Sequence, residues 1–184
     1  VGVKERAAFL NEVGDFPEAH PFVRAIKHRV GLALSPRGRL FLPHFAMNLV
    51  QIFERTGQKV GDFARPLPFK PMAPALVGER SPEAGVVQMR AELDFVSLAA
   101  KFGPDGGLYI LTVTEALAEI RKRDAKLEDP LPVRIDVVDP ESRRVVRTLL
   151  CDPGVKAFDL IDGKRLVYVY QDAEAEIALK GVRF

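Results

Sequence analysis

The sequence predicts an all-β fold that consists of repeated four-stranded antiparallel units, and three observations support this prediction. One pattern occurs twice and then again in shortened form, in segments 31–42, 98–110 and 155–168. The two full copies place a glycine at the same point of a tight turn, Gly38 and Gly106. Short apolar runs precede and follow each turn, as expected for paired strands. Repetition on this scale is typical of array architectures.

The first unit covers residues 30–63. Its expected strands are residues 30–34, 39–45, 49–54 and 59–63. A turn is expected between the first two strands, because Pro36 presets φ and Gly38 tolerates a positive φ. Pro43 is unusual inside a strand, since proline cannot donate a hydrogen bond to the ladder.

The second and third units follow the same plan with changes. The second unit covers 95–150 and turns at Asp105–Gly107; its expected strands are 95–102, 108–113, 133–138 and 145–150. An insert at 114–130 has partly helical spacing of its apolar residues and is predicted to form a short surface helix. The third unit, in 151–184, turns at Asp162–Lys164; its expected strands are 155–160, 166–171 and 176–184. It therefore ends one strand short.

Two segments lie outside these units. Residues 1–29 are a lead-in, either the end of an earlier unit or a short helix. Residues 64–94 form a connector whose proline-rich part, 65–74, is expected to be extended, because it contains four prolines. One interpretation is a long connector that lies on its own sheets. The alternative is a docking arm that binds a partner through a set of proline and apolar side chains, Pro66, Phe69, Pro71, Met72 and Pro74.

The first unit also resembles a known repeat. Its residues 48–53, Asn-Leu-Val-Gln-Ile-Phe, and 57–63, Gly-Gln-Lys-Val-Gly-Asp-Phe, are similar to the NHL-type repeat of six-bladed β-propellers. The resemblance covers 30–63 and extends, less closely, over 95–150 and 155–184. The family usually has an Ala-Asp pair before its asparagine, whereas this chain has Pro-His-Phe-Ala-Met. The resemblance implies a β-propeller-like array of about three blades, an incomplete ring because closure typically needs about four to eight.

The composition limits the possible functions. With 184 residues, of which 47% are hydrophobic, the chain suits one domain with a substantial core. The formal net charge is only +2, so no strong positive field indicates specific nucleic-acid binding. No apolar run approaches the roughly 20 residues of a membrane-spanning helix, so the chain is not expected to be transmembrane.

The cysteine content does not indicate the cellular compartment of the protein. Cys151 is the only cysteine, so an intramolecular disulfide is impossible and cysteine usage does not indicate the redox compartment. The sequence starts with Val1 rather than methionine. A periplasmic or extracellular location is favoured if this start reflects processing.

No motif indicates catalysis, a cofactor or a metal. The serines lack a Gly-x-Ser-x-Gly elbow, and the histidines lack the His-Glu-x-x-His spacing. Cys151 ends a strand and is expected to be a structural thiol, and His44 is expected to be a hydrogen-bonded structural histidine. Turn formation explains the aspartates of the Asp-Gly pairs. No catalytic residue, metal ligand or cofactor is therefore predicted.

These observations favour a non-enzymatic protein-interaction or scaffold subunit that belongs to a larger assembly. Its partner would be another protein or the rest of a larger propeller chain. One alternative is a propeller hydrolase or lactonase with a central divalent metal, which would need a constellation of acidic residues and histidines. The other is a nucleic-acid-binding NHL propeller, which would need a concentrated basic surface with exposed aromatic side chains.

Overall fold

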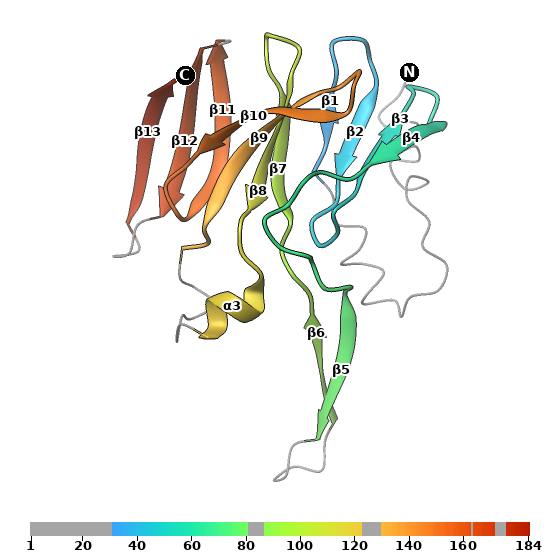
Figure 1. Ribbon diagram of the computed structural model, residues 1–184, viewed down its shortest axis with the longest axis vertical. Helices are drawn as coiled ribbons and strands as arrows, with labels where there is room; N and C mark the ends of the chain where they lie inside the picture. Colours follow the sequence, from blue (N-terminus) through green and yellow to red (C-terminus); the bar gives the residue numbers. More distant parts are fainter. Residues whose placement is uncertain (1–30, 81–86, 123–129, 163, 172–175) are drawn as a thin grey trace, which may run out of the picture.

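The computed structural model describes residues 31–80, 87–122, 130–162, 164–171 and 176–184. This part of the chain is mostly β-structure, as predicted, and all strand pairs are antiparallel. Three sheets stand side by side, and a two-stranded hairpin projects from one end of them (Figure 1). The predicted lead-in at 1–29 lies outside the described residues.

Each sheet is formed by strands that are consecutive in the sequence. Sheet 1 contains β1 (Ala33–Leu34), β2 (Leu40–Pro43), β3 (Val50–Phe53) and β4 (Lys59–Phe63). Sheet 2 contains β7 (Ser97–Phe102), β8 (Leu108–Val113), β9 (Val133–Asp139) and β10 (Arg144–Leu150). Sheet 3 contains β11 (Val155–Asp162), β12 (Arg165–Gln171) and β13 (Ile177–Arg183). Most strands match the predicted ranges to within one or two residues, but β1 is shorter than the predicted 30–34. Among the described residues, sheet 3 has three strands, as expected.

The predicted turns are confirmed. Gly38 has φ 82° and Gly106 has φ 79°, the left-handed region in which glycine lacks the penalty of a side chain. The amide of Gly38 donates to Ser35 O at 2.9 Å, and that of Gly106 donates to Gly103 O at 3.0 Å. In sheet 3 the main-chain amide of Lys164 donates to the carboxylate of Asp162 at 2.8 Å. Local turn chemistry therefore joins the first two strands of each sheet.

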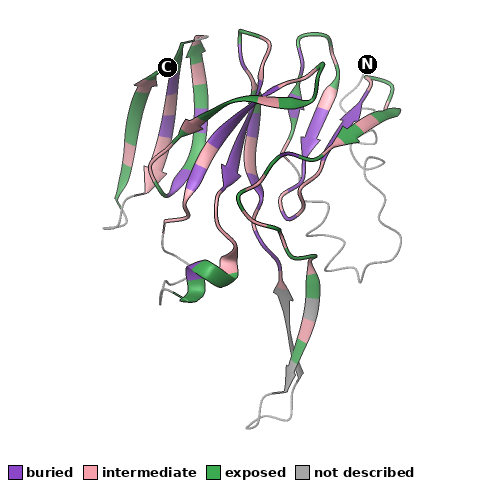
Figure 2. Cartoon of the chain, viewed as in Figure 1, coloured by how far each residue is buried: buried purple, intermediate pink, exposed green. Residues whose placement is uncertain are grey.

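Sheet 2 lies between the other two sheets and has an apolar core on each face (Figure 2). The core shared with sheet 1 contains Ala33, Phe41, Val50, Ile52, Ala100, Leu108, Ile110 and Val138. The core shared with sheet 3 contains Tyr109, Leu111, Val113, Val133, Ile135, Val137, Val155, Phe158, Leu166 and Tyr168. Successive side chains of a strand point to opposite faces. Leu108 and Ile110 of β8 therefore contact sheet 1, and Tyr109 and Leu111 contact sheet 3.

The connector contains a hairpin that was not predicted. Residues 64–74, which include the proline-rich stretch, have no strand, but the following residues form a hairpin of β5 (Ala75–Arg80) and β6 (Val87–Glu92). Main-chain pairing is possible there because no proline lies within either strand. The predicted helical insert contains α3 (Leu117–Lys122); residues 123–129 of that insert lie outside the described part.

One buried carboxylate attaches both the connector and α3 to the sheets. Asp94, which lies just before β7, is 3% exposed. It accepts hydrogen bonds from the amide of Met72 at 2.8 Å and from the amide of Leu117 at 2.7 Å. Next to it, the amide of Val96 donates to Phe45 O of sheet 1 at 2.7 Å. The connector and α3 are therefore both attached where sheets 1 and 2 meet.

The described sheets do not form a closed ring, because sheets 1 and 3 lie on opposite sides of sheet 2 (Figure 1). None of the helical residues described by the structure belongs to a segment long and apolar enough to cross a lipid bilayer.

Candidate functional site

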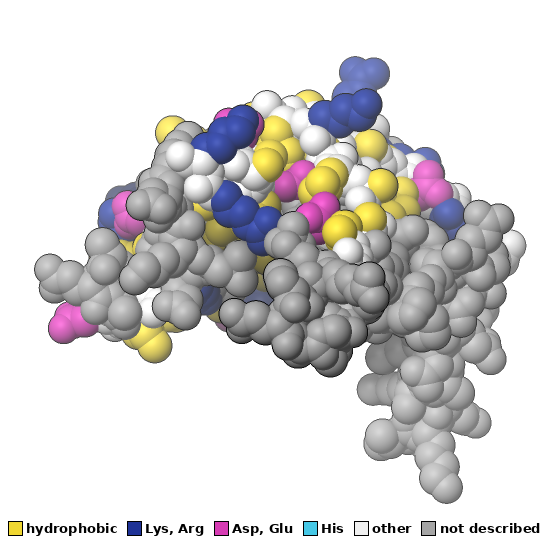
Figure 3. Space-filling model, turned by 90° about the horizontal axis from the view of Figure 1, so that it is seen from below, with side chains coloured by type: hydrophobic (Ala, Val, Ile, Leu, Met, Phe, Trp, Pro, Cys, Tyr) yellow, Lys and Arg dark blue, Asp and Glu magenta, His cyan; other side chains and the backbone are white. Residues whose placement is uncertain are grey.

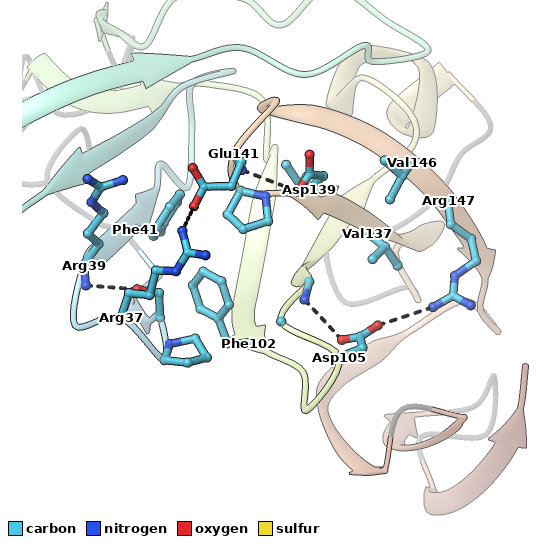
Figure 4. A pocket seen from close by; sticks show the side chains of 16 residues that line it. Arg37, Arg39, Phe41, Phe102, Asp105, Val137, Asp139, Glu141, Val146 and Arg147 are labelled. Atoms are coloured by element: carbon cyan, nitrogen blue, oxygen red, sulfur yellow. Dashed lines mark hydrogen bonds and ion pairs between the residues drawn. The ribbon is translucent and has the colours of Figure 1, made fainter.

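A groove of about 480 Å³ lies between sheets 1 and 2 at their turn ends, and we call it the inter-sheet groove (Figure 4). It is bounded by the β1–β2, β7–β8 and β9–β10 turns and by β10. Its labelled lining residues are Arg37, Arg39, Phe41, Phe102, Asp105, Val137, Asp139, Glu141, Val146 and Arg147. The β1–β2 and β7–β8 turns are corresponding turns of the two repeated units, and the groove forms where the packing of the units brings them together.

The walls of the groove are apolar. Phe41 and Phe102 form an edge-to-face pair with ring centroids 5.2 Å apart. Val146 lies at a register shift of β10, between Val145 and Arg147, and its side chain is 64% exposed. A β-bulge places one residue out of the strand's alternation and re-aims its side chain. Here the bulge places an exposed valine on the groove (Figure 4).

Arginines line the groove along its length. Arg37 of sheet 1 pairs with Glu141 of sheet 2 at 2.5 Å, and both side chains are largely exposed. The guanidinium of Arg39 pairs through Nε with Glu54 at 2.9 Å. Arg147 donates through Nη2 to the hydroxyl of Tyr109 at 3.1 Å. Arg147 Nη2 also lies 4.0 Å from Asp105 Oδ2, and its guanidinium lies over the ring of Phe184, 4.5 Å from the centroid. Each of these arginines is therefore held by a partner on its own chain.

The carboxylates beside the groove are held by the turns. Asp105 accepts from the amide of Gly107 at 3.1 Å and from the hydroxyl of Tyr109 at 2.8 Å. Burial, with this hydrogen bond to Asp105, raises the pKa of Tyr109 to about 12, so the hydroxyl stays protonated at neutral pH. Hydrogen bonds from the side chain and amide of Ser142 lower the pKa of Asp139. These carboxylates use their acceptor oxygens to stabilise turns.

A buried polar cluster lies elsewhere, at the start of the connector. Arg65, which follows β4, inserts its side chain into sheet 2 and is only 3% exposed. Its guanidinium donates to Thr112 Oγ1, to Ser97 Oγ at 2.6 Å and to Asp136 Oδ2 at 3.3 Å. Arg134 Nε pairs with the same carboxylate at 2.8 Å. We call Arg65, Ser97, Thr112, Arg134 and Asp136 the Arg65 cluster.

Burial lowers the pKa of Arg65 to about 10, against the opposing effect of Asp136, so the guanidinium remains charged at neutral pH. The cluster joins the connector to sheet 2 and is too enclosed to meet a substrate. Sequence reasoning missed it. The sequence contains one indication of this cluster: Asp136 lies among the apolar residues of β9. An aspartate that is fully buried needs a charged or hydrogen-bonding partner.

The five residues predicted to bind a partner lie on the connector and do not line the inter-sheet groove. Pro66 is exposed, and its carbonyl accepts a hydrogen bond from Arg134 Nη2 at 2.9 Å. Met72 is 44% exposed at its side chain, while its amide is held by Asp94. Phe69, Pro71 and Pro74 are half-buried. The side chain of Asn48 also holds the N–H and C=O of Arg65. The main chain of the connector is therefore anchored at Arg65, Pro66 and Met72.

The remaining candidates for chemistry have structural surroundings. His44 is 1% exposed, and its Nε2 lies 3.0 Å from Gln51 Oε1, as expected for a structural histidine. The described residues contain no group of three or more histidine, cysteine, aspartate or glutamate side chains arranged to hold a metal ion.

Cys151 is half-buried, and burial together with the charge of Asp152 raises its thiol pKa to about 11. Only the thiolate attacks alkylating reagents. At about pH 8 we therefore expect iodoacetamide to modify the folded chain about a hundredfold more slowly than the urea-unfolded chain, which mass spectrometry can follow. Equal rates for the two forms would contradict the assignment of an inert structural thiol.

Sheet 3 presents a second candidate surface on the side away from sheet 2. Its residues, which we call the open face, are Ala157, Val167, Val169, Ile177 and Leu179. Ile177 is 79% and Leu179 is 72% exposed. A hollow of about 430 Å³ lies over this face and reaches β7, where Lys101 pairs with Asp159 of β11 at 2.8 Å. The open face is thus an apolar surface in contact with solvent.

Comparison with models of known protein families and with curated protein sequences gives no match. Two surfaces of the described chain can contact a partner, namely the inter-sheet groove and the open face of sheet 3.

Proposed function

We propose that the chain is a non-enzymatic protein-interaction or scaffold module, built as three units of a β-propeller-like array that forms part of a larger assembly. The observation that carries this proposal is the open face of sheet 3. It is apolar, yet the described part of the chain leaves its two outermost side chains mostly exposed. Soluble proteins seldom leave a contiguous apolar surface uncovered unless it serves an interaction.

The open face occupies the position at which the earlier units pack on their successors. In sheet 1, Phe41 packs on sheet 2; in sheet 2, Tyr109 and Leu111 pack on sheet 3. In β12 of sheet 3, Leu166 and Tyr168 pack back on sheet 2. The alternate residues of that strand belong to the open face. The next sheet in such a series would cover them.

Two further features support an array that continues. The first strands of the three sheets are neighbours in space, because β7 of sheet 2 contacts both β1 of sheet 1 and β11 of sheet 3. This is the arrangement that a propeller uses around its central channel. Sheet 3 also has one strand fewer than sheets 1 and 2, so β13 is an edge strand among the described residues. An unpaired edge can accept a strand from another polypeptide.

A protein partner fits the open face better than a nucleic acid does. The contacts between successive units are made by aliphatic and aromatic side chains. On the face of the molecule shown in Figure 3, basic and acidic side chains are interspersed with hydrophobic ones. Nucleic-acid affinity depends mainly on neutralising phosphates with concentrated basic residues. No observation specifically favours the metal-dependent hydrolase.

The proposal predicts that the isolated chain associates through its open face. We expect light scattering to show masses above 20.4 kDa that increase with concentration, because uncovered apolar faces find each other. Leu179→Glu places a charge on this face and should return the chain to a monomer. Leu150→Glu is the matched control, since Leu150 is 86% exposed but lies on β10, and it should leave association unchanged.

Circular dichroism of both variants should show the same β-sheet content as the unmodified chain, because the two leucines are exposed. A stable monomer at all concentrations, unaffected by either substitution, would overturn the proposed interaction role of the open face.

A further inference from the structure

We propose that the inter-sheet groove binds an extended peptide segment of a partner protein, in which acidic residues flank an apolar side chain. This surface is distinct from the open face, because no residue lines both. The inference therefore does not depend on whether sheet 3 packs on a further sheet.

The shape of the groove favours an extended ligand. Figure 4 places Arg39 and Arg147 toward opposite ends of the groove. Beyond Arg39 a second hollow of about 120 Å³ continues it, and the two hollows share Arg39, Phe41, Pro140 and Glu141. The second hollow ends at Arg143 and Val60. Together they form a trough across two sheets, which suits a peptide chain better than a compact small molecule.

The middle of the trough accommodates an apolar side chain. Phe41 and Phe102 lie on one side of it, and Val137 and Val146 on the other (Figure 4). Val146 is held outward by the bulge of β10, so its exposed methyl groups add contact area without disturbing the core. An aliphatic or aromatic side chain placed here would be removed from water on several sides, which is the usual basis of a binding pocket.

Hydrogen-bonding capacity indicates that the ligand is acidic. A guanidinium has five N–H donors, and among the described contacts Arg37, Arg39 and Arg147 each bond through a single nitrogen. The neighbouring Asp105 and Asp139 accept from their own turns, and Asp105 also lies 4.0 Å from Arg147 Nη2. The trough therefore has an excess of donors at its ends, and carboxylates are the acceptors that pair with guanidinium in a charge-assisted, bidentate way.

Nucleic acid also offers acceptors, but it fits this surface less well. Three carboxylates, of Asp105, Asp139 and Glu141, line the trough beside the arginines and would repel a continuous polyanion. A peptide can place a few acidic residues beside the arginines at each end and an apolar segment between them, so that its charge is not continuous. The arrangement of charge therefore favours a peptide with acidic residues on both sides of its apolar centre.

Fluorescence anisotropy with the labelled peptide EELFEE tests the proposal on the full chain. We expect saturable binding that weakens at high salt, and at least about tenfold weaker binding of QQLFQQ. Val146→Glu and Val146→Lys remove the same apolar side chain from an exposed position but add opposite charges. The glutamate variant should bind EELFEE at least about fivefold more weakly than the lysine variant, because a charge at the trough repels or attracts the ligand.

A second pair of variants tests the arginines. Arg39→Gln should weaken binding a few-fold, whereas Arg144→Gln, with the same loss of charge on an exposed residue outside the trough, should leave it unchanged. The proposal is overturned if EELFEE fails to bind at up to about 1 mM. It is equally overturned if the Val146 variants bind alike, or if a single-stranded oligonucleotide competes for this site more strongly than the peptide.

Discussion

Replacing Asp136 with asparagine is expected to lower the free energy of unfolding by about 3–5 kcal/mol. The carboxylate is fully buried and pairs with both Arg65 and Arg134, and Thr148 Oγ1 donates to it at 3.3 Å. Asparagine keeps the shape but not the charge, so the buried guanidinium of Arg65 would lose its counter-charge. Urea unfolding followed by circular dichroism measures the difference directly.

The matched control is Asp159→Asn, which removes a carboxylate of the same type from an exposed ion pair. Asp159 pairs with Lys101 at 2.8 Å, and their side chains are 63% and 48% exposed. Water already solvates both charges, so the cost should stay below about 1 kcal/mol. Similar losses for Asp136→Asn and Asp159→Asn would show that the Arg65 cluster does not hold the connector to sheet 2.

Alanine at Gly154 is expected to cost at least about 2 kcal/mol more than alanine at Gly106. Both glycines have φ 79°, so both substitutions carry the left-handed penalty of about 1–2 kcal/mol. At Gly106 an added Cβ would meet no atom within 4 Å. At Gly154 it would lie 2.3 Å from Gln171 O and 2.9 Å from Pro130 Cβ, so the junction between sheets 2 and 3 would have to shift.

Thermal or urea unfolding of the two variants gives the comparison, since the backbone conformation is matched and only the surroundings differ. Gly154 also accepts from the amide of Gln171 at 3.1 Å and donates to Leu131 O at 2.8 Å, so a shift would weaken these bonds. Equal stability of the two variants would mean that the junction can rearrange without cost.

The strands and turns of the sheets could be predicted from sequence because their signals are local. A proline or aspartate followed by glycine specifies a turn within a few residues, and alternating apolar residues on each side specify the faces. The turn at Asp105–Gly107 and the strands on each side of it follow from these signals alone. For the third unit the same signals predict three strands within 155–184, and the described part of sheet 3 has three.

The hairpin β5–β6 and the Arg65 cluster could not be predicted in the same way. The four prolines within 65–74 indicate an extended connector and give no sign of a hairpin. The residues that form β5 and β6 are separated in sequence by a short segment that contains Pro82 and Gly85. The contact between Arg65 and Asp136 depends on how sheet 1 packs on sheet 2, which no local pattern contains. The inter-sheet groove likewise depends on the packing of two units rather than on a motif in either.

The Arg65 cluster also sets an order of events for a chain that folds as it is synthesised. Sheet 1 ends at Phe63, and its pairings join neighbours in sequence, which form early because little chain must be closed into loops. Arg65 follows immediately, but its carboxylate partner lies 71 residues further along the chain. Until Asp136 has been added, the guanidinium lacks its buried counter-charge. Sheet 1 can already contact β7 and β8, but the complete Arg65 cluster must wait for β9.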